Sequence, residues 1–121
     1  SLLLSPSATI GINSGLGEQM EIQSLRKGEE LYFYLKGELD EHAAASLRGR
    51  TDAIIDGNAG LSRAVFNLAG VRFMDSTGIG FLMGRYKKLS RYGIKMALEA
   101  PNEGADKILL LSGIYSLMPK I

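Results

Sequence analysis

The chain has 121 residues, of which 45% are hydrophobic and 22% charged, and its formal net charge is +1. This length and balance are typical of one globular domain, and the near-neutral charge gives no basic field that would indicate nucleic acid as a partner. The chain has no cysteine, which excludes disulfides and thiol chemistry and fits a reducing compartment. No apolar run approaches the ~20 residues that span a bilayer.

Residues 1–19 are rich in Ser, Gly and Leu and follow neither a helical nor a strand period. We interpret them as an N-terminal tail or a non-native remnant, and residues 20–121 as the folded domain. The opening apolar run resembles a signal peptide only superficially, because no positively charged region precedes it.

The first elements of the domain predict a hairpin followed by a helix. "MEIQSL", at 20–25, alternates apolar and polar residues as an edge strand does. After the turn "KGEE", the aromatic-rich "LYFYLKG" at 31–37 predicts the second strand of the hairpin. Asp40 is then a suitable N-cap for a helix that Gly57 ends.

The rest of the domain alternates strands and helices. "RAVFNLAG" is a short apolar run typical of a buried parallel strand. A helix is expected from Ser76 to Tyr92. The strand "IKMALEA", the helix "PNEGADKILLLSG" and a last short strand "IYSLMPKI" follow. The order β-β-α-β-α-β-α-β predicts an α/β fold with a small mixed sheet.

Helical spacing divides the 76–92 helix into two faces. The inner stripe is predicted to hold Ile79, Leu82, Met83, Tyr86 and Leu89. The basic residues are predicted to lie outside and toward the C-terminus, where cations suit the helix dipole: Arg85, Lys87, Lys88 and Arg91.

Three glycines follow a strand and open this helix, which suggests a dinucleotide site. Gly78, Gly80 and Gly84 are spaced G-x-G-x-x-x-G, however, which is one residue longer than the dinucleotide fingerprint. A nucleotide-binding site is therefore disfavoured.

Catalysis and metal binding find little support in the residue types present. Ser76 could be a nucleophile, but the single histidine, His42, lies on another predicted helix, and "MDSTG" is not a nucleophile elbow. Glu38, Asp40 and Asp75 could hold a hard cation, yet no clustered His or Cys ligands accompany them.

The tripeptide Asp75-Ser76-Thr77 leaves two interpretations open. All three residue types make good N-caps, so capping alone explains any one of them. Gly78 and Gly80 cost the helix about 1 kcal/mol each relative to Ala, and they leave a bare surface that another backbone can approach. A hydroxyl beside such a surface would be a good phosphoryl acceptor, and a phosphate would add a charge of about −2.

Two segments resemble a known family. "GELDEHAAASL", followed by "AVFNLAGVRFMDSTGIGFLMGRYKKLSRYG", resembles the STAS domains of anti-sigma factor antagonists. "GRYKKL" points to the sporulation branch, whose members act in the control of sigma F. The resemblance covers Met20 to Ile121 and implies a STAS fold, a small mixed sheet with helices mainly on one face.

The resemblance also implies a function, that of a cytoplasmic binding module rather than an enzyme, with no cofactor or metal. Ser76 would be phosphorylated by a serine kinase that is itself the anti-sigma factor, and a PP2C-type phosphatase would restore it. The unphosphorylated form would bind the kinase and release the sigma factor. The partner-binding surface would hold Asp40, Asp75, Thr77, Gly78 and Gly80. No nucleic acid or membrane takes part, and a monomer is expected.

Two other functions remain open at this stage. The chain could be the STAS module of a stressosome or of another partner-switching cascade, with the same chemistry and a different sigma factor. It could also be a small nucleotide-binding or hydrolytic enzyme that uses residues 75–84. The second is disfavoured because this segment contains no phosphate-binding lysine.

Overall fold

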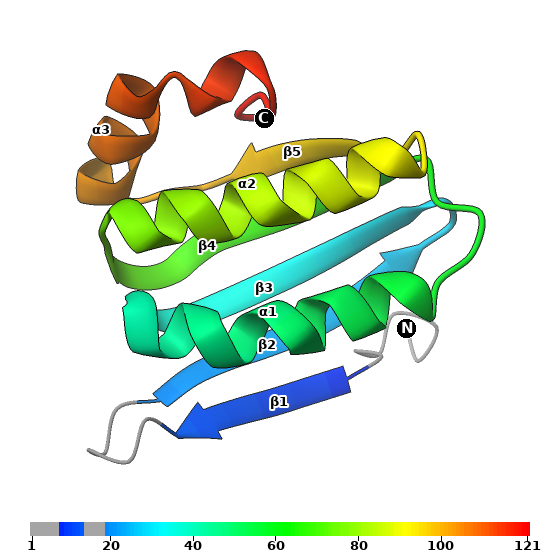
Figure 1. Ribbon diagram of the computed structural model, residues 1–121, viewed down its shortest axis with the longest axis horizontal. Helices are drawn as coiled ribbons and strands as arrows, with labels where there is room; N and C mark the ends of the chain where they lie inside the picture. Colours follow the sequence, from blue (N-terminus) through cyan, green and yellow to red (C-terminus); the bar gives the residue numbers. More distant parts are fainter. Residues whose placement is uncertain (1–7, 14–18) are drawn as a thin grey trace.

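The computed structural model describes residues 8–13 and 19–121. Five strands form one sheet in the order β1-β2-β3-β4-β5 (Figure 1). The elements, in chain order, are β1 (Ala8–Asn13), β2 (Gln19–Lys27), β3 (Glu30–Leu39), α1 (Glu41–Asp56), β4 (Arg63–Met74), α2 (Ser76–Arg91), β5 (Lys95–Glu99), α3 (Glu103–Ser112) and the 3-10 helix η2 (Ile114–Ser116).

The sheet is mixed, as the order of the predicted elements requires. β1 and β3 both pair antiparallel with β2, whereas β3, β4 and β5 are parallel. The β2–β3 hairpin turns at Gly28, whose φ of 63° is the left-handed value that glycine adopts without strain. The predicted hairpin and the parallel crossovers are both confirmed.

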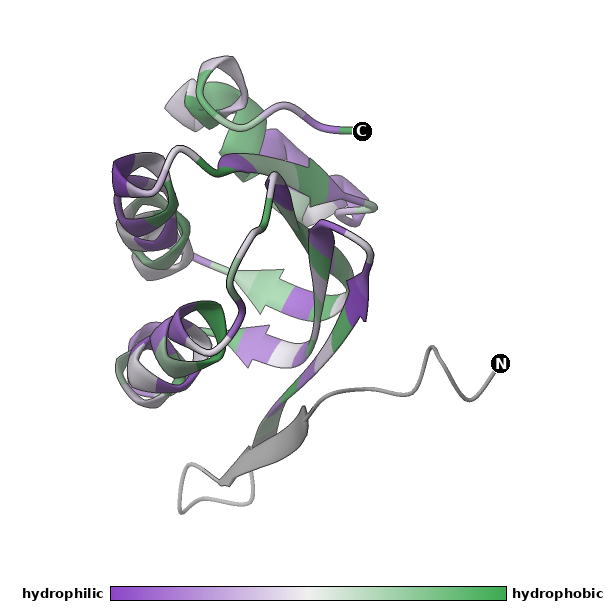
Figure 2. Cartoon of the chain, turned by 90° about the vertical axis from the view of Figure 1, so that its right-hand side faces the viewer, coloured by the Kyte–Doolittle hydropathy of each residue, from purple (hydrophilic) through white to green (hydrophobic). Residues whose placement is uncertain are grey.

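Helices α1 and α2 cover one face of the sheet, and α3 lies at the β5 edge (Figures 1 and 2). Side chains alternate along β3, so that Leu31, Phe33 and Leu35 are buried beneath the helices. The ring of Phe33 stacks on that of Phe66 from β4, with 4.6 Å between centroids. The core therefore lies between one face of the sheet and two parallel helices, which holds the starts of those helices in place.

Two segments differ from the sequence prediction. Residues Ala8–Asn13, inside the segment interpreted as a tail, form β1 against β2. Residues 1–7 and 14–18, the rest of that segment apart from Gln19 in β2, lie outside the described residues. The interpretation of residues 1–19 as a tail or non-native remnant stays a prediction.

The predicted last strand at 114–121 is wrong. Gly113 ends α3 with a left-handed φ of 78°, and η2 follows it directly. Ile114 and Met118 are both buried, and the Met118 N–H donates to the Ile114 carbonyl at 3.0 Å, so the apolar spacing is helical. Only a single bridge, between Lys120 and Leu98, attaches this segment to β5.

Within the described ranges, no helix has both the length and the apolar character needed to cross a bilayer.

Candidate functional site at the starts of α1 and α2

The two helices that cover the sheet begin side by side. Leu39, the last residue of β3, is the register partner of Met74, the last residue of β4. The residue after each strand is an aspartate, Asp40 or Asp75, and each is the N-cap of the helix that follows. Two of the predicted site residues therefore lie at the same edge of the sheet because their strands are parallel neighbours (Figure 1).

Each aspartate performs the capping of its own helix. The Asp40 carboxylate accepts a hydrogen bond from the Ala43 N–H at 3.0 Å. The Asp75 carboxylate accepts two, from the Thr77 N–H at 2.9 Å and from the Thr77 hydroxyl at 2.5 Å. Capping of α2 therefore occupies Asp75 and Thr77, and needs nothing from Ser76.

Ser76 is the first residue of α2 and is exposed. Within residues 8–13 and 19–121, its hydroxyl makes no hydrogen bond. Of the three polar residues that could have capped the helix, Ser76 is the one whose hydroxyl stays available. The Thr77 hydroxyl, in contrast, is already donated to Asp75.

The two glycines of the first turns have different surroundings. Gly78 is buried, and a Cβ there would lie 2.5 Å from Met74 Cγ and 3.3 Å from Leu39 Cδ2. Only glycine lets α2 approach the strand ends this closely. Gly80 is exposed, and a Cβ there would meet no atom within 4 Å. Gly78 therefore supports the site from below, whereas Gly80 leaves its outer surface bare.

A groove of about 650 Å³ runs between α1 and α2. Part of its wall on α2 is the stripe of Ser76, Gly80 and Gly84, which are spaced by four residues and so share one face of the helix. Its full lining is Glu41, Ala44, Arg48, Ser76, Thr77, Gly80, Phe81, Gly84 and Arg85. The glycines leave the middle of this stripe without side chains, so the Ser76 hydroxyl lies at one end of an open groove.

Arg85 was predicted to be exposed, and that prediction is wrong. Its side chain is only 5% exposed, and its Nε lies 2.7 Å from Asp52 Oδ1 on α1. It also donates to the Phe81 carbonyl at 3.3 Å. Burial lowers the pKa of Arg85, Asp52 opposes this, and the positive charge of Arg48 nearby lowers the pKa further.

The buried stripe of α2 is correspondingly displaced from the predicted one. Leu82 and Leu89 are buried as expected, and Ile79, Met83 and Tyr86 are partly buried. The buried residues that the prediction missed are Gly78, Phe81 and Arg85. Position 85 follows Phe81 by four residues, so helical spacing already indicated an inward face, and the charge of arginine was the misleading signal.

The single histidine, the base that a nucleophilic Ser76 was expected to need, does not lie in the groove. His42 is exposed in the first turn of α1 and is not part of the groove lining. No group of three or more His, Cys, Asp or Glu that could hold a metal ion occurs among the described residues. The chemistry that the groove offers is that of one free hydroxyl, Ser76, with charged groups from α1 and α2 around it.

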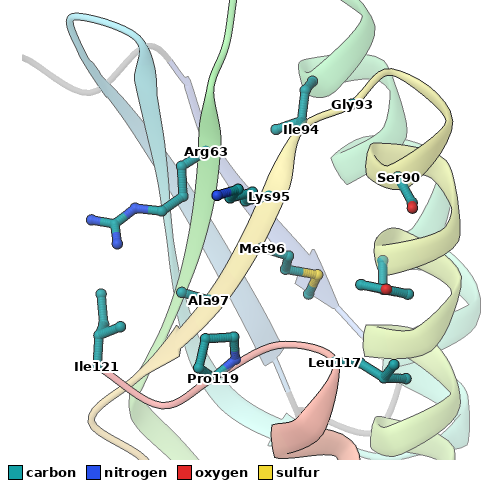
Figure 3. A pocket seen from close by; sticks show the side chains of 11 residues that line it. Arg63, Ser90, Gly93, Ile94, Lys95, Met96, Ala97, Leu117, Pro119 and Ile121 are labelled. Atoms are coloured by element: carbon teal, nitrogen blue, oxygen red, sulfur yellow. The ribbon is translucent and has the colours of Figure 1, made fainter.

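A second hollow, of about 490 Å³, lies beside β5 (Figure 3). Tyr86 and Ser90 of α2, Met96 of β5, and Leu117 and Ile121 of the C-terminal segment line it. None of the predicted site residues lies there. It is mainly apolar and has no constellation of chemical groups comparable to that around Ser76.

Residues 21–121 match the STAS domain family, and the chain belongs to it. An anti-sigma F factor antagonist from Paenibacillus polymyxa is 35% identical over 85 residues, which cover 70% of this chain and 72% of that protein. This confirms the family that the two sequence segments indicated.

Solved structures agree with this assignment. The structure of the anti-sigma factor antagonist SpoIIAA in its unphosphorylated form superposes with a TM-score of 0.69 at 27% identity, covering 83% of this chain and 87% of that one. The Bacillus cell fate determinant SpoIIAA in its phosphorylated form gives a TM-score of 0.61 at 28% identity, covering 83% and 90%. The STAS fold expected from the sequence is confirmed.

Proposed function

We propose that this protein is an anti-sigma factor antagonist whose activity is switched by phosphorylation of Ser76. In its unphosphorylated form it binds an anti-sigma factor that is also a serine kinase, and this binding releases the sigma factor. A PP2C-type phosphatase reverses the modification. The names of its relatives support the class of partner, and their sigma F designation supports sporulation and a cytoplasmic setting.

The observation that carries this proposal is the free hydroxyl of Ser76. It is exposed, it is not needed for capping, and it opens onto the groove beside the bare Gly80. Thr77 is a poorer acceptor, because its hydroxyl donates to the Asp75 carboxylate at 2.5 Å. These contacts favour Ser76 over its neighbour as the modified residue.

The first turn of α2 also suits an added phosphate. α1 has Glu41 in its first turn and α3 has Glu103 and Asp106, whereas α2 has no acidic residue there. The positive end of the α2 dipole therefore lacks a first-turn counter-charge, and a phosphate on Ser76 would supply one. Asp75, at the cap itself, opposes the added charge and limits this gain.

A phosphate on Ser76 would prevent docking of a partner on the same surface. The partner would contact Asp40, Asp75 and Thr77 around the bare surface at Gly80, with Gly78 holding α2 against the strand ends. A bulky dianion at the centre of this surface would abolish its shape complementarity to the partner. If two interface hydrogen bonds of about 1 kcal/mol each are lost, affinity falls about 30-fold.

The test is phosphorylation by the purified anti-sigma factor of the same organism with ATP, followed by mass spectrometry. Wild type and Thr77→Val should each take up one phosphate, and Ser76→Ala none. A full equivalent of phosphate on Ser76→Ala would contradict the assignment. Ser76→Asp should bind the anti-sigma factor at least tenfold more weakly than wild type, and equal binding would contradict the switch.

The sigma factor is tested separately. Unphosphorylated protein should displace sigma F from its complex with the anti-sigma F factor, as measured by gel filtration of the three components. Displacement of a different sigma factor, with none of sigma F, would place the chain in another partner-switching cascade or a stressosome.

A further inference from the structure

The groove beside Ser76 contains one uncompensated cation. Arg85 is paired with Asp52 and with the Phe81 carbonyl. Arg48 of α1 lines the same groove and is exposed, and in the part of the chain that the structure describes its guanidinium forms no ion pair or hydrogen bond. The groove therefore has a free hydroxyl on one wall and a free guanidinium on the other.

The path between Arg48 and Ser76 is open. Gly80 and Gly84 form the wall of α2 between them, and a Cβ at either glycine would meet nothing within 4 Å. α1 and α2 follow parallel strands, so they run in the same direction (Figure 1). Side chains on a helix tilt toward its N-terminus, which for α1 is the end of the groove where Ser76 lies. The Arg48 charge also lies close enough to Arg85 to lower its pKa, so Arg48 stands between Arg85 and the Ser76 end of the groove.

We propose that Arg48 binds the phosphoryl group of phosphorylated Ser76 within the same molecule, across the groove and over Gly80. The inference rests on the proposed modification of Ser76. Guanidinium and phosphate form paired, charge-assisted hydrogen bonds, which lysine cannot reproduce. The phosphate then fills the groove that a partner would enter, so phosphorylation excludes the partner by occupying the site as well as by charge.

The other charged groups around the phosphate set the balance that Arg48 must overcome. Glu41 lines the groove from α1, and the capping carboxylates of Asp40 and Asp75 lie at the same edge. All three repel a dianion. Arg85 adds a positive charge at the far end, but Asp52 largely neutralises it. Arg48 is thus the only cation of the groove lining that is left to compensate the phosphate.

The experiment uses full-length protein with phosphoserine installed at position 76 by amber suppression, so that no kinase is needed. Titration followed by ³¹P NMR measures the second pKa of the phosphate, which is about 6 for free phosphoserine. Arg48→Gln should raise this pKa by about one unit, as expected for loss of an adjacent opposite charge. Arg48→Lys should lie between wild type and Arg48→Gln.

Arg50→Gln is the matched control. Arg50 is exposed on the same helix but does not line the groove, and its loss changes the net charge equally. Equal pKa changes in Arg48→Gln and Arg50→Gln would overturn the proposal, because both would then reflect only long-range charge.

Thermal unfolding gives a second measurement. Phosphorylation of Ser76 should change the midpoint more favourably in wild type than in Arg48→Gln. The difference between the two changes is the coupling that a double-mutant cycle measures. Zero coupling would also overturn the inference. Since the phosphoserine is installed without a kinase, neither result bears on whether the anti-sigma factor phosphorylates Ser76, which the kinase assay decides.

Discussion

Helices α1 and α2 begin in the same way and become different surfaces. Each follows one of two paired strand ends, and each is capped by an aspartate, Asp40 or Asp75. After the cap, α1 continues with an exposed acid, Glu41, whereas α2 continues with Ser76, whose hydroxyl is free. A capping residue is therefore enough to begin a helix, whereas the residues after the cap decide whether the helix N-terminus can be a functional site.

The two helices also depend on each other. α1 supplies one wall of the groove and α2 the other, and the pair of the buried Arg85 with the partly exposed Asp52 joins them. A second, more exposed pair, Lys88 of α2 with Asp56 of α1, also links the two helices.

Removing the link between the helices should have the largest effect on stability. Asp52→Ala leaves the buried Arg85 guanidinium with the Phe81 carbonyl but without its carboxylate, which should lower the free energy of unfolding by about 2–3 kcal/mol. Urea unfolding followed by circular dichroism measures it. Asp56→Ala is the control: Asp56 lies on α1 like Asp52, but it is exposed and pairs with Lys88 of α2. Its loss should change the free energy of unfolding by less than about 1 kcal/mol. Equal losses in the two variants would show that Arg85 is not held by Asp52.

The two glycines of α2 should respond to alanine in opposite directions. Gly78→Ala places a Cβ against Met74 and should cost about 2 kcal/mol in the free energy of unfolding. Gly80→Ala enters open space, so its higher helix propensity should stabilise the fold by up to about 1 kcal/mol. Binding of the anti-sigma factor should nevertheless weaken in Gly80→Ala. If stability and binding changed in the same direction in both variants, Gly78 and Gly80 would not have the separate roles of packing and of keeping the surface open.

The capping aspartates and Ser76 should differ in how much their replacement changes the free energy of unfolding, measured by urea unfolding. Asp75→Ala should lower the free energy of unfolding by about 1 kcal/mol, and Asp40→Ala by a similar amount, because each removes a helix cap. Ser76→Ala should change it by less than about 0.5 kcal/mol, because no hydrogen bond is lost. A loss in Ser76→Ala as large as in Asp75→Ala would mean that Ser76 shares the capping.

The smallest effect is expected at α3, which is capped by the neutral Asn102 instead of an aspartate. Hydrogen bonds from Tyr115 and Lys120 hold the pKa of Asp106 below its usual range. The ionised carboxylate therefore contributes stability above its unfolded pKa, about 3.9, and this is lost as pH falls through the lower folded value. Asp106→Asn should flatten the fall in urea midpoint below about pH 4. Parallel curves for the two proteins would show that Asp106 is not coupled to folding.

Much of the fold and the position of the site could be predicted from local rules. Alternation in β2 and β3, helical spacing after Asp40 and Asp75, and turn residues such as Gly28 are short-range signals, and the structure follows them. The predicted last strand failed because Gly113 and Pro119 flank a segment whose apolar spacing, Ile114 to Met118, is helical. The predicted exposure of Arg85 was wrong because its partner, Asp52, lies 33 residues away on another helix.

By itself, the sequence determined the order of the elements, the capped start of α2 and the presence of three candidate polar residues, since these depend on contacts within a few residues. Only the tertiary structure decided which residue does what. The close approach of α2 to Met74 requires Gly78, the open groove exposes Gly80, and the bonds of Thr77 to Asp75 leave Ser76 free. Parallel pairing of β3 with β4 brought α1 beside α2, and that put Arg48 and Ser76 on the walls of one groove.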